Sequence, residues 1–310
     1  MRYLVTGGAG FIGSNLVNRL LDDGHEVVVI DNESSDAHEN FYWNDKAENY
    51  KYDIADYDDI FPLFKNVDVV FHIAAQARIQ VCIENPTTAA KSNMLGTCCV
   101  LQAAKENGVK RLIYSSTSSA YGLANEPPLV ETMPNDCLNP YSVSKVSGEE
   151  LCKMYTDLYG FETIIFRYFN VYGEHQPIKG QYAPVIGIFQ RQLAAGELMT
   201  VVGDGLQTRD YTHVSDVVEA NIAAANTKNE NAIKQTFNLG CGNSFSVMDL
   251  VKMIGEWESP EEGVDFVYIP QRPGEARDTL SNSSKAHRLL NWTPKVKLQD
   301  WISSYKEVTS

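Results

Sequence analysis

Hydrophobic and polar positions in the first half of the chain follow two alternating patterns. Residues 1–6 and 25–30 are short apolar runs, the second rich in valine, which is typical of buried strands. Between them, apolar residues recur at three- and four-residue intervals from Phe11 to Leu21, and Gly24 follows. This spacing predicts a helix that ends at Gly24, and therefore one strand–helix–strand unit.

The alternation of strand and helix patterns continues to about residue 170. Strands that alternate with helices form parallel sheets covered on both faces, so the chain is predicted to have an α/β fold with a doubly wound parallel sheet of the Rossmann type. The further strands are predicted at 67–74, 110–115 and 162–168, and the helices at 87–106 and 141–158.

The pattern loosens after residue 170, where prolines and glycines divide the chain into shorter pieces. We therefore predict two domains, a larger sheet domain over 1–170 and a smaller α/β domain over 171–310. One later apolar run, near 236–240, is predicted to be a strand that returns to the main sheet, so that the two domains interleave.

Composition narrows the classes of partner. The 310-residue chain has a net charge of −14, and this acidity argues against binding to a nucleic-acid backbone. No apolar stretch is long enough to cross a bilayer, and the N-terminus begins a strand rather than a signal peptide, so no membrane partner is expected. The six cysteines show no metal-ligand spacing, which favours free thiols in the cytoplasm and no metal site.

A glycine-rich turn joins the first predicted strand to the first helix. Residues 7–13, Gly-Gly-Ala-Gly-Phe-Ile-Gly, contain the G-x-G-x-x-G pattern in the strand–turn–helix context that a dinucleotide fingerprint requires. Gly7 permits the tight turn, Gly10 lets the backbone approach a pyrophosphate, and Gly13 lets helix and strand pack closely. The amides of the helix N-terminus then face the phosphates. A plain tight turn is the alternative interpretation.

Asp31 ends the second predicted strand, 18 residues after Gly13. A carboxylate at this position accepts hydrogen bonds from ribose hydroxyls and repels a 2′-phosphate, which favours NAD over NADP. A turn or helix cap is the alternative role for Asp31. The domain over 1–170 is accordingly predicted to bind NAD, and the domain over 171–310 to bind the substrate.

Tyr141 and Lys145 are four residues apart on the predicted helix over 141–158, so they share one face. An ammonium beside a phenol stabilises the phenolate and lowers its pKa from about 10, which makes Tyr141 the candidate general base. Thr117 supplies a hydroxyl to hold the substrate oxygen beside it. An ordinary pair on the helix surface, and a local cap for Thr117, are the alternatives.

These residues belong to a longer series of motifs in which the chain resembles the extended short-chain dehydrogenase/reductase family, specifically its NAD-dependent nucleotide-sugar epimerase/dehydratase branch. The resemblance covers nearly the whole chain. The motifs are TGGAGFIG (6–13), Asp31-Asn32, Asp53-Ile54, HIAAQA (72–77), NMLGT (93–97), SSTSSAYG (115–122), NPYSVSK (139–145), RYFNVYG (167–173), RDYTHVSDV (209–217) and RPGEARD (272–278).

The resemblance implies roles for individual residues. Tyr141 would be the catalytic base, Lys145 would bind the nicotinamide ribose, and Thr117 would complete the catalytic set. Arg209 and Arg272 would clamp the diphosphate of the substrate, with surface ion pairs as the alternative. The implied cofactor-binding residues are Gly7, Gly10, Phe11, Ile12, Gly13, Asp31, Asn32, Asp53, Ile54, Ala74, Ala75, Gln76, Asn93, Tyr141 and Lys145. The implied substrate-binding residues are Thr117, Asn170, Arg209, Arg272 and Glu275.

The residues after Thr117 distinguish between the reactions of this family, which all begin with oxidation at C4 of the sugar. In the 4,6-dehydratase branch the matching sequence is Thr-Asp-Glu, and in the glucuronate decarboxylase branch it is Thr-Ser-Glu. In this chain Thr117 is followed by Ser118 and Ser119. Neither serine can serve as a carboxylic acid, so the implied outcome is return of the hydride to the other face of the sugar. The resemblance thus implies 4-epimerisation of a UDP-sugar, with NAD regenerated in each cycle.

Two regions bear on the sugar. Residues 180–186 resemble the bacterial UDP-N-acetylglucosamine 4-epimerase type, and Thr279 stands where the narrow UDP-galactose enzymes carry tyrosine. A smaller residue leaves room for an N-acetyl group, so UDP-GlcNAc and UDP-GalNAc, with UDP-glucose and UDP-galactose, are the predicted substrates. Arg78 departs from the small residues expected in a neutral-sugar pocket, which keeps UDP-glucuronate 4-epimerisation open. A non-catalytic NAD-binding scaffold and a net oxidoreductase are the remaining alternatives.

The resemblance also implies a homodimer, in which the helices over 87–106 and 141–158 of two chains form a four-helix bundle. Apolar residues on these helices, such as Val100 and Leu151, face either the core or this interface, and the sequence does not decide between the two.

Overall fold

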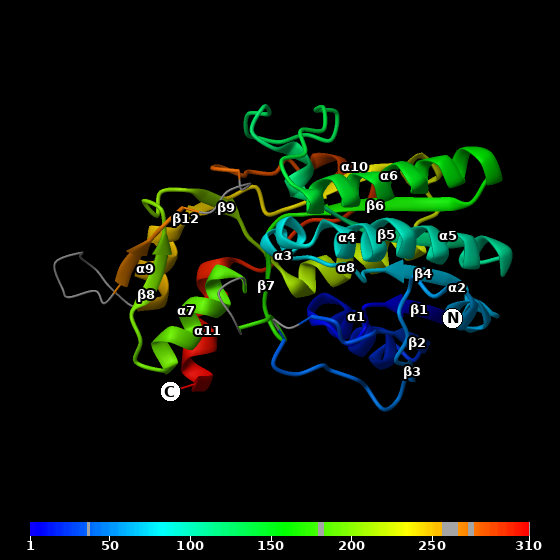
Figure 1. Cartoon of the computed structure of the whole chain (residues 1–310), viewed down its shortest axis with the longest axis horizontal. Coiled ribbons are helices and arrows are strands. Elements are labelled where there is room, and N and C mark those ends of the chain that lie inside the picture. Colours follow the sequence, from blue (N-terminus) through cyan, green and yellow to red (C-terminus); the bar gives the residue numbers. More distant parts are fainter. Residues whose placement is uncertain (36–37, 179–182, 256–265, 272–275, 310) are drawn as a thin grey trace.

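The computed structural model describes residues 1–35, 38–178, 183–255, 266–271 and 276–309. Its largest element is a seven-stranded sheet in the order β11-β6-β5-β4-β1-β2-β3, in which every strand runs parallel to its neighbours. The α/β fold with a doubly wound parallel sheet is therefore confirmed (Figure 1). The strands are β1 (Arg2–Thr6), β2 (Glu26–Ile30), β3 (Glu48–Tyr50), β4 (Val69–His72), β5 (Arg111–Thr117), β6 (Glu162–Tyr168) and β11 (Thr236–Leu239).

Both faces of the sheet are buried because successive side chains of each strand point in opposite directions. In β1, Tyr3 and Val5 join the core under α1 (Phe11–Asp22), α8 (Val214–Asn226) and α10 (Ser284–Leu290). Leu4 joins the core on the other side, under α5 (Gly96–Glu106) and α6 (Pro140–Tyr159), which lie side by side across that face (Figure 1). Continuous apolar strands are therefore explained by burial on two faces.

The helix predicted over 87–106 changes its geometry along its length. It comprises α4 (Pro86–Ala89), a π-helical turn η2 (Ala90–Leu95) and α5. Asn93, within the π turn, is fully buried, and its amide side chain bonds both the backbone N–H and the carbonyl of Gln76, at 2.8 and 3.1 Å. It also donates to Ser144 Oγ on α6 at 2.9 Å. The π turn thus fastens the loop after β4 to α6.

Helix α6 begins with a capping box that fixes its first turn. Asn139 Oδ1 accepts a hydrogen bond from the Ser142 amide at 2.9 Å, the Ser142 hydroxyl accepts one from the Asn139 amide at 3.3 Å, and Pro140 occupies the first helical position. Gly160 ends the helix in a left-handed conformation (φ +65°). Tyr141 therefore sits in the most tightly held turn of the helix.

The C-terminal part of the chain forms a second lobe with its own apolar cluster, which includes Phe189, Leu250 and Trp301. Figure 1 shows this lobe beyond one end of the main sheet. The chain leaves it to add β11 to the sheet beside β6, where Thr236 pairs with Ile165. The elements outside the main sheet are α7 (Val185–Ala194), α9 (Val247–Gly255), α11 (Leu298–Thr309), β7 (Val171–Tyr172), β8 (Met199–Val202), β9 (Thr208–Asp210), β10 (Thr212–His213), β12 (Ser244–Ser246) and β13 (Phe266–Ile269).

The other short elements are α2 (Tyr57–Ile60), η1 (Phe61–Phe64), α3 (Ile79–Glu84), η3 (Ser118–Tyr121) and η4 (Glu230–Ala232). In the part of the chain that the structure describes, no helix combines the length and the apolarity that a membrane span requires.

Candidate active site

A cavity of about 530 Å³ opens at the carboxyl ends of the sheet strands. Its wall includes Ile30, Thr117 and Tyr168, the last residues of β2, β5 and β6, and continues onto α7 and β9 of the second lobe. Ligands of open α/β sheets bind at this edge. The predicted site residues that line the cavity are Gly7, Gly10, Phe11, Ile12, Gly13, Asp31, Asn32, Asp53, Ile54, Ala74, Ala75, Gln76, Arg78, Thr117, Tyr141, Asn170 and Arg209.

Five predicted site residues are not among these lining residues. Lys145 and Asn93 are buried behind the wall of the cavity. The hydroxyl of Thr279 is also behind the wall, where it accepts a hydrogen bond from the Asn170 amide group at 3.5 Å. Arg272 and Glu275 lie outside the described residues. The ligand contacts assigned to these five residues stay predictions.

The glycine turn has the close packing that the dinucleotide fingerprint requires. A Cβ atom on Gly13 would lie 2.0 Å from the carbonyl oxygen of Gly7, which itself has a φ of +69°. A Cβ atom on Gly10, in contrast, would be in ordinary van der Waals contact with its nearest neighbour, 3.5 Å away, and Gly10 lines the cavity. Helix α1 begins at this point without a side-chain cap, and its first amides remain for an anion. The turn therefore fits a cofactor pyrophosphate.

Asp31 caps a turn and also lines the cavity, so the cap does not exclude its predicted role at a ribose. Its carboxylate accepts hydrogen bonds from the Ala9 amide at 3.1 Å and the Glu33 amide at 2.8 Å, so it caps the turn. It also lines the cavity. Burial raises the pKa of Asp31, and the amides of Glu33 and Ala9 oppose this effect by stabilising the carboxylate. A ribose hydroxyl in the cavity would meet an acceptor that is already fixed in place.

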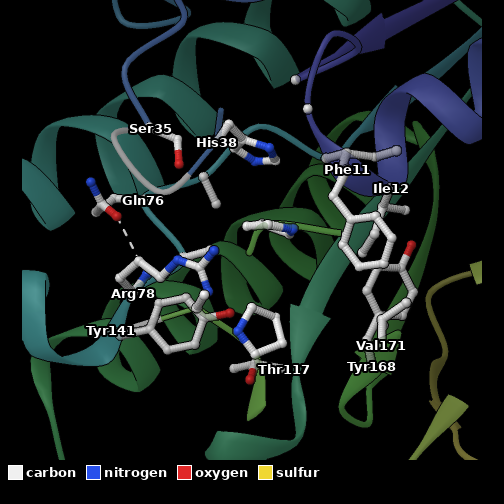
Figure 2. Close-up of a pocket in the computed structure, with 18 of the residues that line it drawn as sticks. Phe11, Ile12, Ser35, His38, Gln76, Arg78, Thr117, Tyr141, Tyr168 and Val171 are labelled. Carbon is white, nitrogen blue, oxygen red and sulfur yellow. Dashed lines mark hydrogen bonds between the residues drawn. The ribbon is translucent and has the colours of Figure 1, made fainter. Parts of the chain in front are cut away.

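Tyr141, Thr117 and Arg78 come together at one end of the cavity, from α6, β5 and the loop after β4 (Figure 2). Burial raises the pKa of Tyr141, and a hydrogen bond with Thr117 and the charge of Arg78 oppose this rise. The sequence-based prediction of a lowered pKa is therefore wrong for this structure, because burial is the largest effect on the phenol.

Lys145 points beneath the site rather than into it. Its Nζ lies 4.3 Å from the centroid of the Tyr114 ring, a distance typical of a cation–π contact. Burial lowers the pKa of Lys145 to about 7, and the neighbouring Cys152 and Glu149 only partly oppose this. Near neutral pH a large fraction of Lys145 is consequently uncharged.

A buried ion pair holds the strand that carries Thr117. Arg167 on β6 donates from Nε and Nη2 to the two carboxylate oxygens of Glu149 on α6, both at 2.8 Å. Ser116 donates its hydroxyl to the same carboxylate. All three residues are buried, so the network ties β5, which carries Thr117, and α6, which carries Tyr141, to β6. Removal of one partner from such a pair costs about 3–5 kcal/mol of stability.

Several cavity residues were not predicted from the sequence. Ser35 and His38 follow Asp31 in the segment after β2, and Tyr211 lies inside the RDYTHVSDV motif beside Arg209. The hydroxyl of Tyr211 is buried without a hydrogen-bond partner among the described residues. For Ser35 and His38 the available signal was their place in the segment that follows the second predicted strand, and for Tyr211 it was a motif that already contained Arg209.

A family model described as "NAD dependent epimerase/dehydratase family" matches residues 3–240 of the chain. A protein of Methanocaldococcus jannaschii, described as a putative UDP-glucose 4-epimerase, is 39% identical over 301 residues, which are 96% of this chain and 95% of that protein.

Two solved structures share the fold over the full length of the chain. The UDP-glucose 4-epimerase of Thermotoga maritima, solved with UDP-glucose, has 34% sequence identity and a TM-score of 0.90, with all of both chains covered. The UDP-N-acetylglucosamine 4-epimerase of Methanobrevibacter ruminantium, in complex with UDP-N-acetylmuramic acid, has 30% identity and a TM-score of 0.88. That match covers 100% of this chain and 99% of the other.

Proposed function

Since the chain belongs to the NAD-dependent epimerase/dehydratase family, we propose that it catalyses the reversible 4-epimerisation of a UDP-hexose. The proposed substrates are UDP-GlcNAc and UDP-GalNAc, together with UDP-glucose and UDP-galactose. NAD is the cofactor, and the glycine turn and Asp31 fit its pyrophosphate and ribose.

The catalytic cycle moves one proton and one hydride out and back. When bound, NAD supplies the acceptor and then the donor of the hydride at C4 of the sugar. Tyr141 removes the proton of the 4-hydroxyl as the ketone forms, and Thr117 holds that oxygen by hydrogen bonding. Tyr141 returns the proton to the same oxygen once the ketone has turned its other face to the cofactor. The net change is inversion at C4.

The distribution of carboxylates in the cavity is the observation that supports a closed cycle. Among the described lining residues, the carboxylates are Asp31 and Asp53, which follow β2 and β3 and belong to the residues that we assign to NAD. Ser118 and Ser119 line the wall beside Thr117. A 4-keto sugar at Tyr141 would thus have no carboxylic acid among these residues to assist elimination of water.

The residue behind Asn170 supports an N-acetylated sugar through its small size, although Thr279 does not itself line the cavity. Thr279 contributes only a short side chain there, 3.5 Å from the Asn170 amide group. A structural neighbour with 30% identity is named a UDP-N-acetylglucosamine 4-epimerase. We take both N-acetylated and neutral UDP-hexoses as substrates on this basis.

Arg78 supports a second candidate, 4-epimerisation of UDP-glucuronate. The guanidinium lies at the Tyr141 end of the cavity (Figure 2). The C6 group of a sugar whose 4-hydroxyl meets Tyr141 lies close to that end, and a guanidinium fork suits a C6 carboxylate.

One assay tests both candidates. The protein loaded with NAD is incubated separately with UDP-GlcNAc, UDP-glucose and UDP-glucuronate, and the anomeric protons are followed by NMR. We expect galacto-configured products from the first two nucleotide sugars. Conversion of UDP-glucuronate alone would replace the first candidate by the second, and Arg78→Gln should then lower kcat/KM for this sugar about 10- to 100-fold. Absence of all three conversions, with NAD bound, would contradict the proposed function.

We further propose a homodimer through α5 and α6. Met94, Leu95, Val143 and Leu158 are exposed apolar side chains along η2 and α6, and such residues on adjacent helices indicate an association surface. Val143→Glu should convert a dimer into a monomer, as measured by light scattering after gel filtration. Leu123→Glu, on an exposed loop, is the matched control and should not change the molar mass. A monomeric parent protein would refute the proposal.

A cytoplasmic location is also proposed. All six cysteines of the chain are free thiols, three of them buried, which is typical of proteins kept in a reducing compartment.

A further inference from the structure

A histidine lies over the glycine turn. His38 belongs to the segment that crosses the cavity after β2, and Figure 2 shows its ring between Ser35 and Phe11 at the cavity wall. Its Nε2 is 3.9 Å from the position that a Cβ atom on Gly10 would occupy. The part of the cavity beside Gly10 therefore has the helix amides at its wall and an imidazole nitrogen close by.

This space is the part of the site that fits the cofactor pyrophosphate. In a dinucleotide fingerprint, the glycine at the Gly10 position lets the backbone approach the phosphates. The N-terminus of α1 offers amides and a partial positive charge, but no full charge. An imidazolium at His38 would add a full positive charge within reach of the same oxygens.

The surroundings of His38 keep its imidazole neutral at pH 7 when no anion is present. Burial, and then the charge of Arg78, lower the pKa of His38 to about 4. The ring of Phe41 packs against it, with centroids 5.6 Å apart. The nearby Asp31 carboxylate is engaged by the amides of Ala9 and Glu33, and Glu39, next in sequence, is exposed. A pyrophosphate with two negative charges would reverse this balance, because it favours the protonated ring.

We propose that His38 binds the pyrophosphate of NAD and takes up a proton as the cofactor binds, so that NAD is held more tightly as the pH falls. The inference rests on the NAD cofactor of the family and not on which sugar is epimerised. Binding of NAD is accompanied by proton uptake at pH values between the pKa of His38 in the free protein and its pKa in the complex. In that range NAD affinity rises as the pH falls, by about tenfold between pH 8 and pH 6, a coupling of ordinary size.

The test measures equilibrium binding of NAD and of ADP-ribose, which also carries the pyrophosphate, to nucleotide-free protein at pH 6 and pH 8. His38→Gln should bind both ligands about equally well at the two pH values, with affinity about tenfold below that of the parent at pH 6. His38→Arg, which is charged at both pH values, should bind tightly at both. His287→Gln, on the exposed face of α10, is the matched control and should keep the pH dependence of the parent.

Burial lowers the pKa of Lys145 to about 7, so this residue can also make NAD binding depend on pH. The test therefore compares the His38 variants with the parent protein and does not rely on the pH dependence of the parent alone. A His38→Gln protein that keeps the full pH dependence of NAD binding would overturn the proposal. So would a His38→Arg protein whose affinity for both ligands falls at pH 6 and pH 8 alike. A failure of sugar turnover leaves these binding results unaffected, which separates this inference from the proposed reaction.

Discussion

Replacement of Tyr141 by phenylalanine is expected to lower the rate of 4-epimerisation by about 10³- to 10⁴-fold while the protein still binds NAD. The phenol is the proton acceptor and donor for the sugar oxygen, and a positioned acid–base group contributes about 10²- to 10⁴-fold. Phenylalanine preserves the packing of the first turn of α6, whose capping box is independent of this side chain. Turnover is measured by NMR with the accepted UDP-sugar, and NAD binding by equilibrium titration.

The matched control is Tyr268→Phe, the same substitution at an exposed tyrosine of β13, which should leave the rate unchanged. A Tyr141→Phe protein with more than a tenth of the parent rate would show that another group moves the proton. If the substitution left both NAD binding and an unrelated activity intact, this result would support the interpretation of the protein as a non-catalytic NAD-binding scaffold. A steady accumulation of reduced cofactor during turnover by the parent would favour a net oxidoreductase.

Lys145→Met is expected to stabilise the cofactor-free protein although it removes activity. The ammonium of Lys145 is buried, and burial lowers its pKa to about 7 from an ordinary value of 10.5. The unfolded chain therefore binds more protons at this residue than the folded chain between these values, and the stability penalty is largest below pH 7. At about 1.4 kcal/mol for each pKa unit, the gain on removing the charge is at most about 4–5 kcal/mol.

The pH profile of unfolding tests this sign. The gain in unfolding free energy should be full at pH 6, smaller at pH 9, and close to zero well above pH 10.5, where lysine is neutral in both states. Lys153→Met, on the same helix, is the control, since its ion pair with Glu150 is partly exposed and worth little. Loss of stability at both pH 6 and pH 9 in Lys145→Met would refute the prediction. It would show that the contact between Lys145 and the Tyr114 ring stabilises the fold by more than burial of the charge destabilises it.

The elements predicted most accurately from the sequence are those whose pattern is set by burial alone. β1 and β2 are continuous apolar runs, and α1 repeats apolar residues at helical spacing and is followed by Gly24. β3 was not predicted because its three residues include no apolar run and pair only at the edge of the sheet. The π turn within the helix over 86–106 was also missed, since one wider turn leaves no periodic signal.

The site divides along a similar line. Residues at or soon after the ends of predicted strands, such as Gly10, Asp31 and Thr117, were found from motifs and their spacing. They line one cavity because parallel strands end at the same edge of the sheet. The direction of a long side chain was not predictable, because helical spacing shows which face of the helix a residue lies on but not which rotamer its side chain adopts. Lys145 lies on the same face of the helix as Tyr141, but its ammonium contacts the ring of Tyr114. His38 was missed because it comes from an irregular segment whose path depends on the whole cavity wall.

The return of the chain to the main sheet has a consequence for the protein during its synthesis. β6 ends at Tyr168, and its neighbour β11 ends at Leu239, about 70 residues later. At ribosomal rates of about 5–20 residues per second, the hydrogen-bonding edge of β6 waits roughly 4–14 s for its partner. The part of the sheet face that α10 covers is open for longer still, because α10 begins only at Ser284. The half-made chain therefore presents an unpaired edge next to an apolar surface, and chaperone capture is most useful to it during this interval.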